Sequence, residues 1–200
     1  MIEIKDVTLY QIPEVVRIHN SSFKGFFLTQ LGNDFLYLYY NSVRLHKEGI
    51  LLGAFIKNDL VGFCAATTYS NGFNKRLIRS NFCSYSKVAI KLFFTKPSAL
   101  FRLLKNLTKR DSSISDNGKY SELLSIGVDV NKQGLGIGKE LILALEQNLK
   151  QLSCSALSLT TDCEKNEKTV AFYERTGFSV LYEFWVWPNR KMYRLIKKLN

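Results

Sequence analysis

A run of alternating glycines constrains the fold of this chain more than any other feature. Gly134, Gly136 and Gly138 stand between an apolar run, 123–128, and a helical repeat of apolar residues that begins at Leu141. A glycine-rich turn before a helix leaves N–H groups free at the positive end of the helix dipole, and glycine lets a phosphate approach the backbone. The sequence therefore predicts a strand, a turn and a helix, with an anion site at the turn.

Three kinds of phosphate site use such a turn. A P-loop places serine or threonine after its Gly-Lys pair, but Glu140 follows Gly138 and Lys139 here. A dinucleotide fold uses G-x-G-x-x-G early in a long series of strands and helices, whereas the spacing here is G-x-G-x-G and too few residues follow. The third pattern, Q/R-x-x-G-x-G/A, matches Gln133, Gly136 and Gly138. A turn that binds no ligand remains the alternative.

A second pattern follows downstream. Asn166 begins a helical segment, Phe172 and Tyr173 form an aromatic pair within it, and Gly177-Phe178 closes it. Asparagine is a good N-cap and glycine a good residue just past a helix, so a plain helix explains those two positions. It does not explain the aromatic pair followed closely by Gly-Phe.

With both patterns in this order, the chain resembles the GNAT acyltransferases over roughly residues 2–69 and 120–199. The resemblance implies an α/β (α+β) fold. Its central sheet would be mixed but mostly antiparallel, with six to seven strands and flanking helices. Two parallel strands in the middle, 121–130 and 156–162, would splay apart. A helical insertion would lie between strands 3 and 4.

Hydrophobic periodicity predicts the other elements. Strands are expected over 3–8, 50–56, 60–69, 178–187 and 190–198, and helices over 9–20, 34–46, 84–94, 97–108, 136–151 and 166–176. A polar turn at 57–59 joins two of the strands as a hairpin. The length suits a single domain, 1–200, that includes the insertion at 70–119.

The resemblance implies that acetyl-CoA is the co-substrate and that no metal takes part. The pyrophosphate would bind the N–H groups of the glycine turn, and the pantetheine arm would pair with the backbone of Val128 and Val130 like an added strand. The Val128 N–H would polarise the thioester carbonyl. The residues expected to bind coenzyme A are Val128, Asp129, Val130, Gln133, Gly134, Leu135, Gly136, Ile137, Gly138, Lys139, Asn166 and Phe172.

The implied reaction moves an acetyl group directly from the thioester to a primary amine in a ternary complex. Tyr173 is the expected acid for the departing thiolate, since a phenol is protonated at neutral pH; a packing tyrosine is the alternative. Glu122 is the expected base, acting through water, with a solvated strand end as the alternative. We expect His19 and His46 to be surface or pocket-edge residues.

The positive charge is concentrated in one segment. The chain has a net charge of +11, and 70–120 carries +9 of it, because eleven basic residues there meet only Asp111 and Asp116. The basic residues are Lys75, Arg76, Arg79, Lys87, Lys91, Lys96, Arg102, Lys105, Lys109, Arg110 and Lys119. The charge therefore belongs to the insertion and not to the whole chain.

The acceptor pocket is expected between the loop 21–30, the aromatic helix 34–46, the basic insertion and Trp185 and Trp187. Aromatic faces and clustered cations suit an anionic amine, and we expect an amino sugar carried on a nucleotide. A peptide N-terminus or a small amine is the alternative acceptor.

A function of another class is an acyl-CoA-binding adapter that docks to a membrane or a partner through 84–108. That segment carries Val88, Ile90, Leu92, Phe93, Phe94, Leu100 and Phe101 among its basic residues. The insertion could equally just cap the sheet with a solvated basic face. We expect no nucleic-acid partner, because no recognised motif accompanies the charge.

The cellular setting follows from absences in the sequence. No apolar run reaches the length that spans a bilayer, and the N-terminus lacks the apolar core of a signal peptide. Four cysteines without C-x-x-C spacing and two histidines argue against a zinc site. We therefore expect a cytoplasmic protein with reduced thiols, as a monomer or homodimer.

Overall fold

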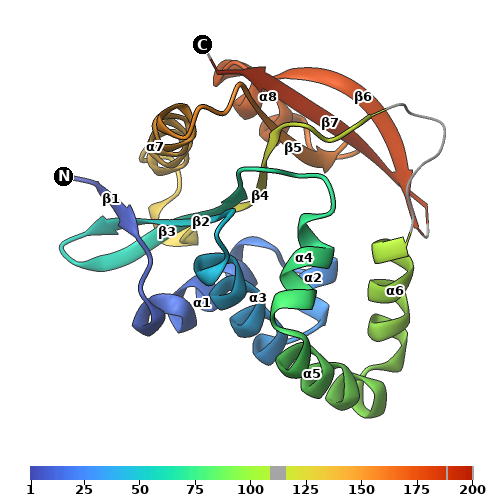
Figure 1. Cartoon of the computed structure of the whole chain (residues 1–200). Coiled ribbons are helices and arrows are strands. Elements are labelled where there is room, and N and C mark those ends of the chain that lie inside the picture. The colour runs from blue at the N-terminus through green and yellow to red at the C-terminus, as the bar shows by residue number, and fades with distance from the viewer. Residues whose placement is uncertain (109–115, 188, 200) are drawn as a thin grey trace.

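The computed structural model describes residues 1–108, 116–187 and 189–199, with the backbone alone for 104 and 106–108. Within them, seven strands form one sheet in the order β1-β2-β3-β4-β5-β7-β6 (Figure 1). The strands are β1 (Glu3–Asp6), β2 (Gly49–Ile56), β3 (Asp59–Thr67), β4 (Ser121–Val128), β5 (Ala156–Asp162), β6 (Ser179–Val186) and β7 (Arg190–Lys198). β4 and β5 pair in parallel, and the other neighbours are antiparallel.

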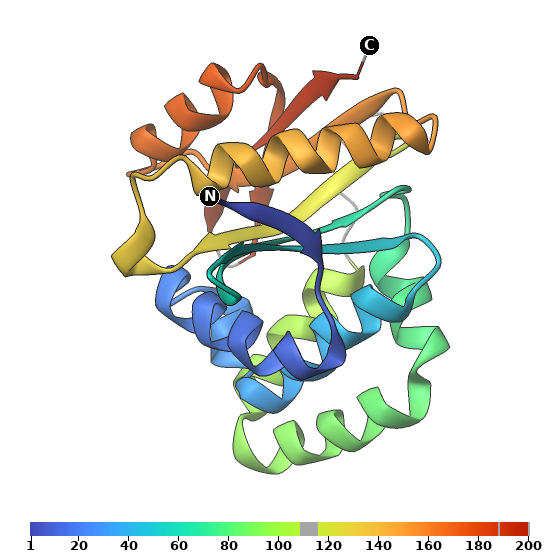
Figure 2. The same ribbon diagram turned by 90° about the vertical axis from the view of Figure 1, so that its left-hand side faces the viewer.

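Helices cover both faces of the sheet. They are α1 (Ile12–Ser22), α2 (Phe27–Gln30), α3 (Asn33–Leu45), α4 (Phe73–Ser80), α5 (Phe82–Thr95), α6 (Pro97–Thr108), α7 (Ile137–Gln151) and α8 (Glu167–Arg175). Two short 3-10 turns are η1 (Leu9–Gln11) and η2 (Val130–Lys132). Helices α7 and α8 lie on one face and α1 to α6 on the other (Figures 1 and 2). The predicted mixed sheet with flanking helices is therefore confirmed.

Alternation along the central strands builds one core on each face. In β2, Leu51 and Phe55 face the cluster under α1 and α3, whereas Leu52 and Ala54 face the cluster under α7. Side chains on a strand point alternately to the two faces, so a strand buried on both sides is apolar throughout. The β2–β3 hairpin turns at Lys57 and Asn58, whose positive φ angles of 51° and 71° are typical of a two-residue type I′ turn.

β4 and β5 separate soon after they meet. Their parallel pairing runs only from Ser121 to Leu123 on β4. A bulge against β3 follows, because Ala66 pairs with Leu123 and Ala65 with Ser125, which leaves Leu124 as an extra residue. A bulge bends the strand that carries it. The splayed parallel strands predicted from the sequence are thus present, with β4 ending at Val128, two residues earlier than expected.

In its described residues, the insertion between β3 and β4 holds three helices, one more than the sequence predicts. The missed helix, α4, is short and exposes half of its eight residues, but Phe73 and Leu77 are buried at 2% and 1% exposure. Two apolar residues four apart are too few to indicate a helix by periodicity. Lys109, Arg110 and Asp111 lie outside the described residues.

Smaller corrections concern the first helix and the loop after it. The helix predicted over 9–20 begins with η1, and α1 then continues to Ser22. The loop predicted over 21–30 contains the end of α1 and the short helix α2. The bend between α1 and α2 carries Phe23 and Phe26, and it places both rings beside the splayed strands.

Candidate active site

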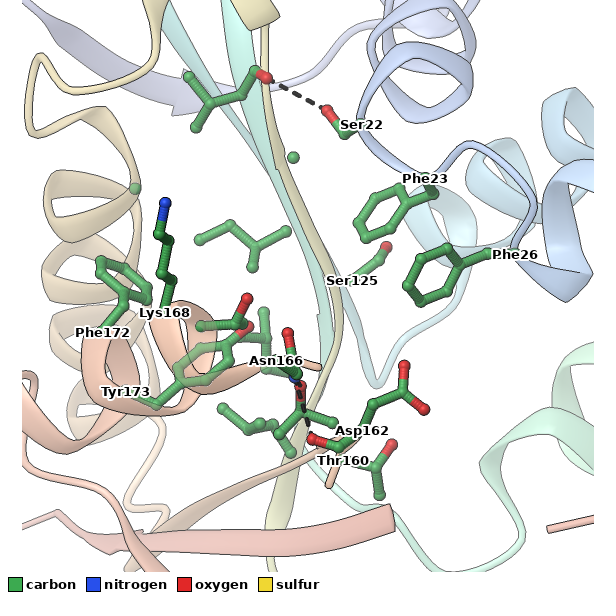
Figure 3. A pocket seen from close by; sticks show the side chains of 18 of the residues that line it. Ser22, Phe23, Phe26, Ser125, Thr160, Asp162, Asn166, Lys168, Phe172 and Tyr173 are labelled. Carbon is green, nitrogen blue, oxygen red and sulfur yellow. Dashed lines mark hydrogen bonds between the residues drawn. The ribbon is translucent and has the colours of Figure 1, made fainter. Parts of the chain in front are cut away.

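A cavity of about 1110 Å³ lies where β4 and β5 separate. One side, here called the glycine half, is formed by Gly134, Gly136, Gly138, Lys139, Asn166, Lys168, Phe172 and Tyr173. The other side, the aromatic half, is formed by His19, Ser22, Phe23, Phe26, Phe27, Asp162, Arg190 and Met192. Figure 3 shows Phe172 and Tyr173 across β4 from Phe23 and Phe26. The cavity therefore offers two differently lined walls on either side of one strand.

The backbone of the glycine turn adopts the left-handed conformation that glycine favours. Gly134 and Gly136 have φ angles of 81° and 78°, in the left-handed region where other residues are strained. Gly136 is the N-cap of α7, so the start of this helix has N–H groups without helical partners, and Gly136, Ile137 and Gly138 line the cavity there. A Cβ on Gly138 would lie 3.3 Å from the Phe172 ring, so this glycine also lets α7 approach α8.

Basic side chains reinforce this anion site. Lys132, Lys139, Lys165 and Lys168 all line the cavity. Their charges add to the partial positive charge at the start of α7. The expected anion site at the turn therefore has both the open backbone and the surrounding charge that a phosphate requires.

The main chain of β4 faces the gap at alternate residues. The Asp129 N–H donates to the Val61 carbonyl (2.9 Å), and Gly62 pairs with Val128. Hydrogen-bonded pairs alternate with non-bonded ones in an antiparallel ladder, so Val128 and Ile126 direct their N–H and C=O groups away from β3. The Val128 carbonyl accepts a hydrogen bond from the Ser22 hydroxyl (3.1 Å).

Asn166 braces the same gap from the other strand. Its side-chain amide donates to Thr161 Oγ1 (2.7 Å) and to the Asp162 carbonyl (3.0 Å) (Figure 3). These bonds tie the start of α8 to the end of β5, beyond the point where β5 has left β4. The amide is therefore used to fix the strand end, and no side-chain hydrogen bond caps α8.

Tyr173 stands on the cavity wall with its ring packed between Phe172 and Phe178, at centroid distances of 5.3 and 5.7 Å. The residue is 7% exposed, and burial raises the pKa of its hydroxyl well above the usual value of 10. The phenol is thus fully protonated at neutral pH. This position suits the expected acid.

Glu122 does not line the cavity. Its carboxylate accepts a hydrogen bond from Arg194 Nη1 (2.5 Å) and another from the Ser70 hydroxyl. Both side chains of the Glu122–Arg194 pair are nearly buried, at 17% and 15% exposure. The partner lies 72 residues away, so no local pattern could have indicated that this carboxylate is engaged.

Three other expected coenzyme A ligands also lie outside the cavity lining. Asp129 accepts from the Asn131 N–H (2.9 Å) and from Arg17 (2.6 Å), and these two contacts lower its pKa. Val130 and Leu135 expose 50% and 59% of their surface. Val130 belongs to η2 and so cannot extend β4 as the sequence suggested.

His19 is the residue that sequence reasoning undervalued. It is 2% exposed, lines the cavity, and stacks against Phe23 at 4.7 Å. Its Nδ1 lies 2.6 Å from the Tyr40 hydroxyl, which is 3.1 Å from Ser125 Oγ. Its helical spacing from Val15 and Val16 could have placed it on the buried face of α1.

The imidazole of His19 is neutral and has one nitrogen free. Burial lowers its pKa to about 4. Its Nε2 has no hydrogen-bond partner among the described residues. A buried polar atom without a partner is costly, so such an atom on a cavity wall indicates a place where a ligand completes the bonding.

The aromatic half matches only part of the frame expected for the acceptor. Phe23, Phe26 and Phe27 line it, and Arg190 lies over the Phe26 ring (5.0 Å) while pairing with Asp162. Described residues of the insertion, of α3 and of the Trp185–Trp187 region do not line it. Instead, Arg102 lies over the outside of the Phe27 ring (4.9 Å).

Two features are absent from the described residues. These residues contain no group of three or more His, Cys, Asp or Glu side chains placed to hold a metal ion. No helix among them is both long and apolar enough to cross a membrane.

Comparison with known proteins identifies the architecture. A family model described as "Acetyltransferase (GNAT) family" matches residues 12–178. The solved ribosomal-protein-S18-alanine N-acetyltransferase from Escherichia coli superposes with a TM-score of 0.63 at 12% identity, covering 100% of this chain and 95% of that one. Ard1 from Thermoplasma volcanium gives 0.64 at 14%, covering 100% and 98%.

A third solved structure contains the ligand that the glycine turn suggests. The PaiA N-acetyltransferase from Thermoplasma acidophilum, in complex with coenzyme A, gives a TM-score of 0.56 at 15% identity, covering 99% of each chain. No curated protein matches this chain significantly. At these identities the structural likeness shows the fold alone.

Replacing Gly136 by alanine tests the anion site. We expect Gly136→Ala to raise the Kd for coenzyme A about tenfold, because a left-handed alanine costs roughly 1–2 kcal/mol and the turn would relax out of its binding conformation. Gly72→Ala is the matched control, since Gly72 is also a left-handed N-cap (φ 72°) but begins α4, away from the cavity. Calorimetric titration that gave wild-type affinity for Gly136→Ala would contradict the assignment.

Proposed function

Because this chain belongs to the GNAT acetyltransferase family, we propose that it transfers an acetyl group from acetyl-CoA to a primary amine while both substrates are bound. The observation that carries this proposal is that one cavity joins the glycine half, with its open backbone and lysines, to the aromatic half. The glycine half suits the donor and leaves the aromatic half free for an acceptor. Holding both together makes the transfer effectively unimolecular.

The donor site follows from the backbone of two elements. The pyrophosphate of coenzyme A would accept hydrogen bonds from the first turn of α7, with Lys139 and Lys168 beside it. The pantetheine arm would pair with the main chain of Ile126 and Val128, which faces the gap. The Val128 N–H would then donate to the thioester oxygen as negative charge develops there.

We propose that the amine nitrogen attacks the thioester carbon, that the carbon–sulfur bond breaks, and that Tyr173 gives its proton to the departing thiolate. Burial keeps the Tyr173 phenol protonated before the transfer. Solvent restores the proton to the phenolate once the product thiol has left. A thiolate that is protonated as it departs is a better leaving group.

Removal of one hydroxyl tests this role. We expect Tyr173→Phe to lower kcat about 100-fold, the usual loss for a general acid, with the Kd for coenzyme A unchanged. Tyr85→Phe is the control: burial also raises the pKa of Tyr85, to about 12, but this residue lies outside the cavity. Equal kcat values for Tyr173→Phe and the wild type in a steady-state assay would rule the acid out.

For the proton that the amine must lose, we propose His19 in place of Glu122. The free Nε2 of His19 is on the cavity wall, whereas the Glu122 carboxylate is paired with Arg194. A pKa of about 4 makes His19 a weak base for a free ammonium ion. The acceptor therefore attacks as the free amine, after its ammonium form has given one proton to solvent. The nitrogen becomes far more acidic as it bonds to carbon, so its next proton can pass to Nε2 at that stage. Tyr40 fixes the ring through Nδ1.

Two substitutions distinguish the role of His19 from that of Glu122. We expect His19→Asn, whose amide can keep the Tyr40 contact but lacks an atom at Nε2, to lower kcat about 100-fold. We expect Glu122→Gln to lower the free energy of unfolding by roughly 1–3 kcal/mol, since Arg194 loses its charged partner, and to leave kcat near wild type. The reverse pattern, a large loss of kcat for Glu122→Gln alone, would return the base role to Glu122.

As acceptor we propose an amino sugar carried on a nucleotide. The faces of Phe23, Phe26 and Phe27 suit a sugar ring. Arg190 at the same wall uses Nε and Nη2 in its pair with Asp162, so a phosphate would be met through Nη1. The basic residues of the insertion lend no support, because its described residues do not line the cavity. Support for the acceptor therefore comes from the aromatic wall and Arg190.

An acceptor screen tests this choice. With acetyl-CoA as donor and thiol release as readout, we expect turnover of amino-sugar nucleotides, with Phe26→Ala raising the KM for the acceptor and not the KM for acetyl-CoA. Turnover of alanine-terminated peptides or small amines alone would overturn the sugar while keeping the acetyl transfer. Coenzyme A binding without turnover of any amine would instead favour the adapter function.

A further inference from the structure

Helix α5 is apolar on two opposite faces. Its inner face carries Tyr85 and Leu92, which are 8% and 5% exposed and pack in the core beside α3. Its outer face carries four large apolar side chains that solvent reaches freely, here called the outer patch. These are Phe82 (66% exposed), Ile90 (60%), Phe93 (61%) and Phe94 (78%). A helix that contacts only its own domain needs one apolar face, so the second face requires an explanation.

The outer patch lies at an extremity of the molecule. Helix α5 forms the edge of the helical layer farthest from α7 (Figures 1 and 2). On a helical wheel, Phe82, Phe93, Ile90 and Phe94 fall within one third of the circumference, on the side away from Tyr85 and Leu92. The four side chains therefore lie on one side of the helix, with Ser86 between Phe82 and Ile90, and are directed outward.

The segment that carries the patch has charged side chains of one sign only. Residues 73–108 contain eight Lys or Arg and no Asp or Glu. Lys87 follows the patch on the helical wheel, and it is exposed and without an ion pair among the described residues. Lys91 contacts Asp34, but both side chains are more than 60% exposed, so that pair is weak.

Exposed phenylalanines beside exposed lysines favour one kind of surface. Apolar side chains enter the boundary between headgroups and acyl chains, and each lysine or arginine close to an anionic leaflet adds roughly 1 kcal/mol. A second copy of this chain would instead bring its own positive insertion against this one. Helix α5 has 14 residues, too few to span a bilayer but enough to lie along its surface.

We propose that α5 docks this protein onto an anionic phospholipid surface, with Phe82, Ile90, Phe93 and Phe94 inserted below the headgroups. The docking surface is connected to the aromatic half of the cavity, because Lys96 donates to the Gln30 carbonyl (2.8 Å) and Arg102 lies over Phe27. Docking is separate from acetyl transfer, since the outer patch does not line the cavity.

Vesicle sedimentation of the full chain tests the proposal. We expect binding to vesicles of equal parts phosphatidylcholine and phosphatidylglycerol, and none to phosphatidylcholine alone. Binding should fall steeply at about 1 M salt, where the Debye length is about 3 Å. The double variant Phe93→Ser with Phe94→Ser should lose at least tenfold in affinity for the anionic vesicles, because two inserted rings are removed.

The matched control removes exposed apolar area elsewhere. Val180 and Leu181 on β6 are 47% and 45% exposed and lie away from α5. The double variant Val180→Ser with Leu181→Ser should bind anionic vesicles as the wild type does. Both double variants should bind coenzyme A normally, which shows that each is folded and makes this test independent of the acceptor.

Cys83 provides a direct depth probe, because it is exposed on α5 beside Phe82. With Cys154 and Cys163 changed to serine, an environment-sensitive dye on Cys83 should shift its emission to the blue when anionic vesicles are added. The same dye at Gln151→Cys in a Cys83→Ser background, at the exposed end of α7, should not shift.

The proposal is overturned if the dye on Cys83 does not respond, or if the Phe93 and Phe94 variant binds anionic vesicles as tightly as the wild type. Concentration-dependent dimerisation that this variant abolishes, seen by analytical ultracentrifugation without any vesicle binding, would assign the outer patch to a second copy of the chain.

Discussion

The separation of β4 from β5 after Leu123 is the constraint on which the site depends. Three paired residues hold the strands together, and the bulge at Leu124 then turns β4 away. The main-chain groups of Ile126 and Val128 consequently face an open gap and not a neighbouring strand. Backbone N–H and C=O groups in such a position need another hydrogen-bond partner. Asn166 fixes the far side of the gap. A sheet that remained paired here would have neither the cavity nor a place for an extended substrate.

Burial favours the protonated form of Tyr173 and the deprotonated form of His19, which lie on either side of that gap. Desolvation penalises whichever form is charged, so it keeps Tyr173 protonated and keeps His19 deprotonated. One residue can therefore give a proton and the other can take one at the same pH. Glu122 has the residue type expected of a base, but its charge is engaged by Arg194, and the pair ties β4 to β7. Environment, more than residue type, decides which groups are available for chemistry.

In the insertion too, the position of the residues and not their type decides what they contact. Its charge suggested a role in holding an anionic acceptor, yet its described residues brace the outside of the cavity wall through Arg102 and Lys96. Its apolar residues divide between a face that packs on α3 and the outer patch. One segment thus completes the core on one side and presents an unpartnered surface on the other.

The sequence alone determined the glycine turn, the helix that follows Asn166, the hairpin at Lys57 and Asn58 and the positions of the strands along the chain, because φ preferences and hydrophobic periodicity act between near neighbours. Only the tertiary structure decided that Arg194 meets Glu122, that Tyr40 orients His19, and which apolar residues of α5 face outward. Those contacts join residues far apart in the chain, and their pairing depends on sheet register and helix rotation. No local pattern encodes either quantity.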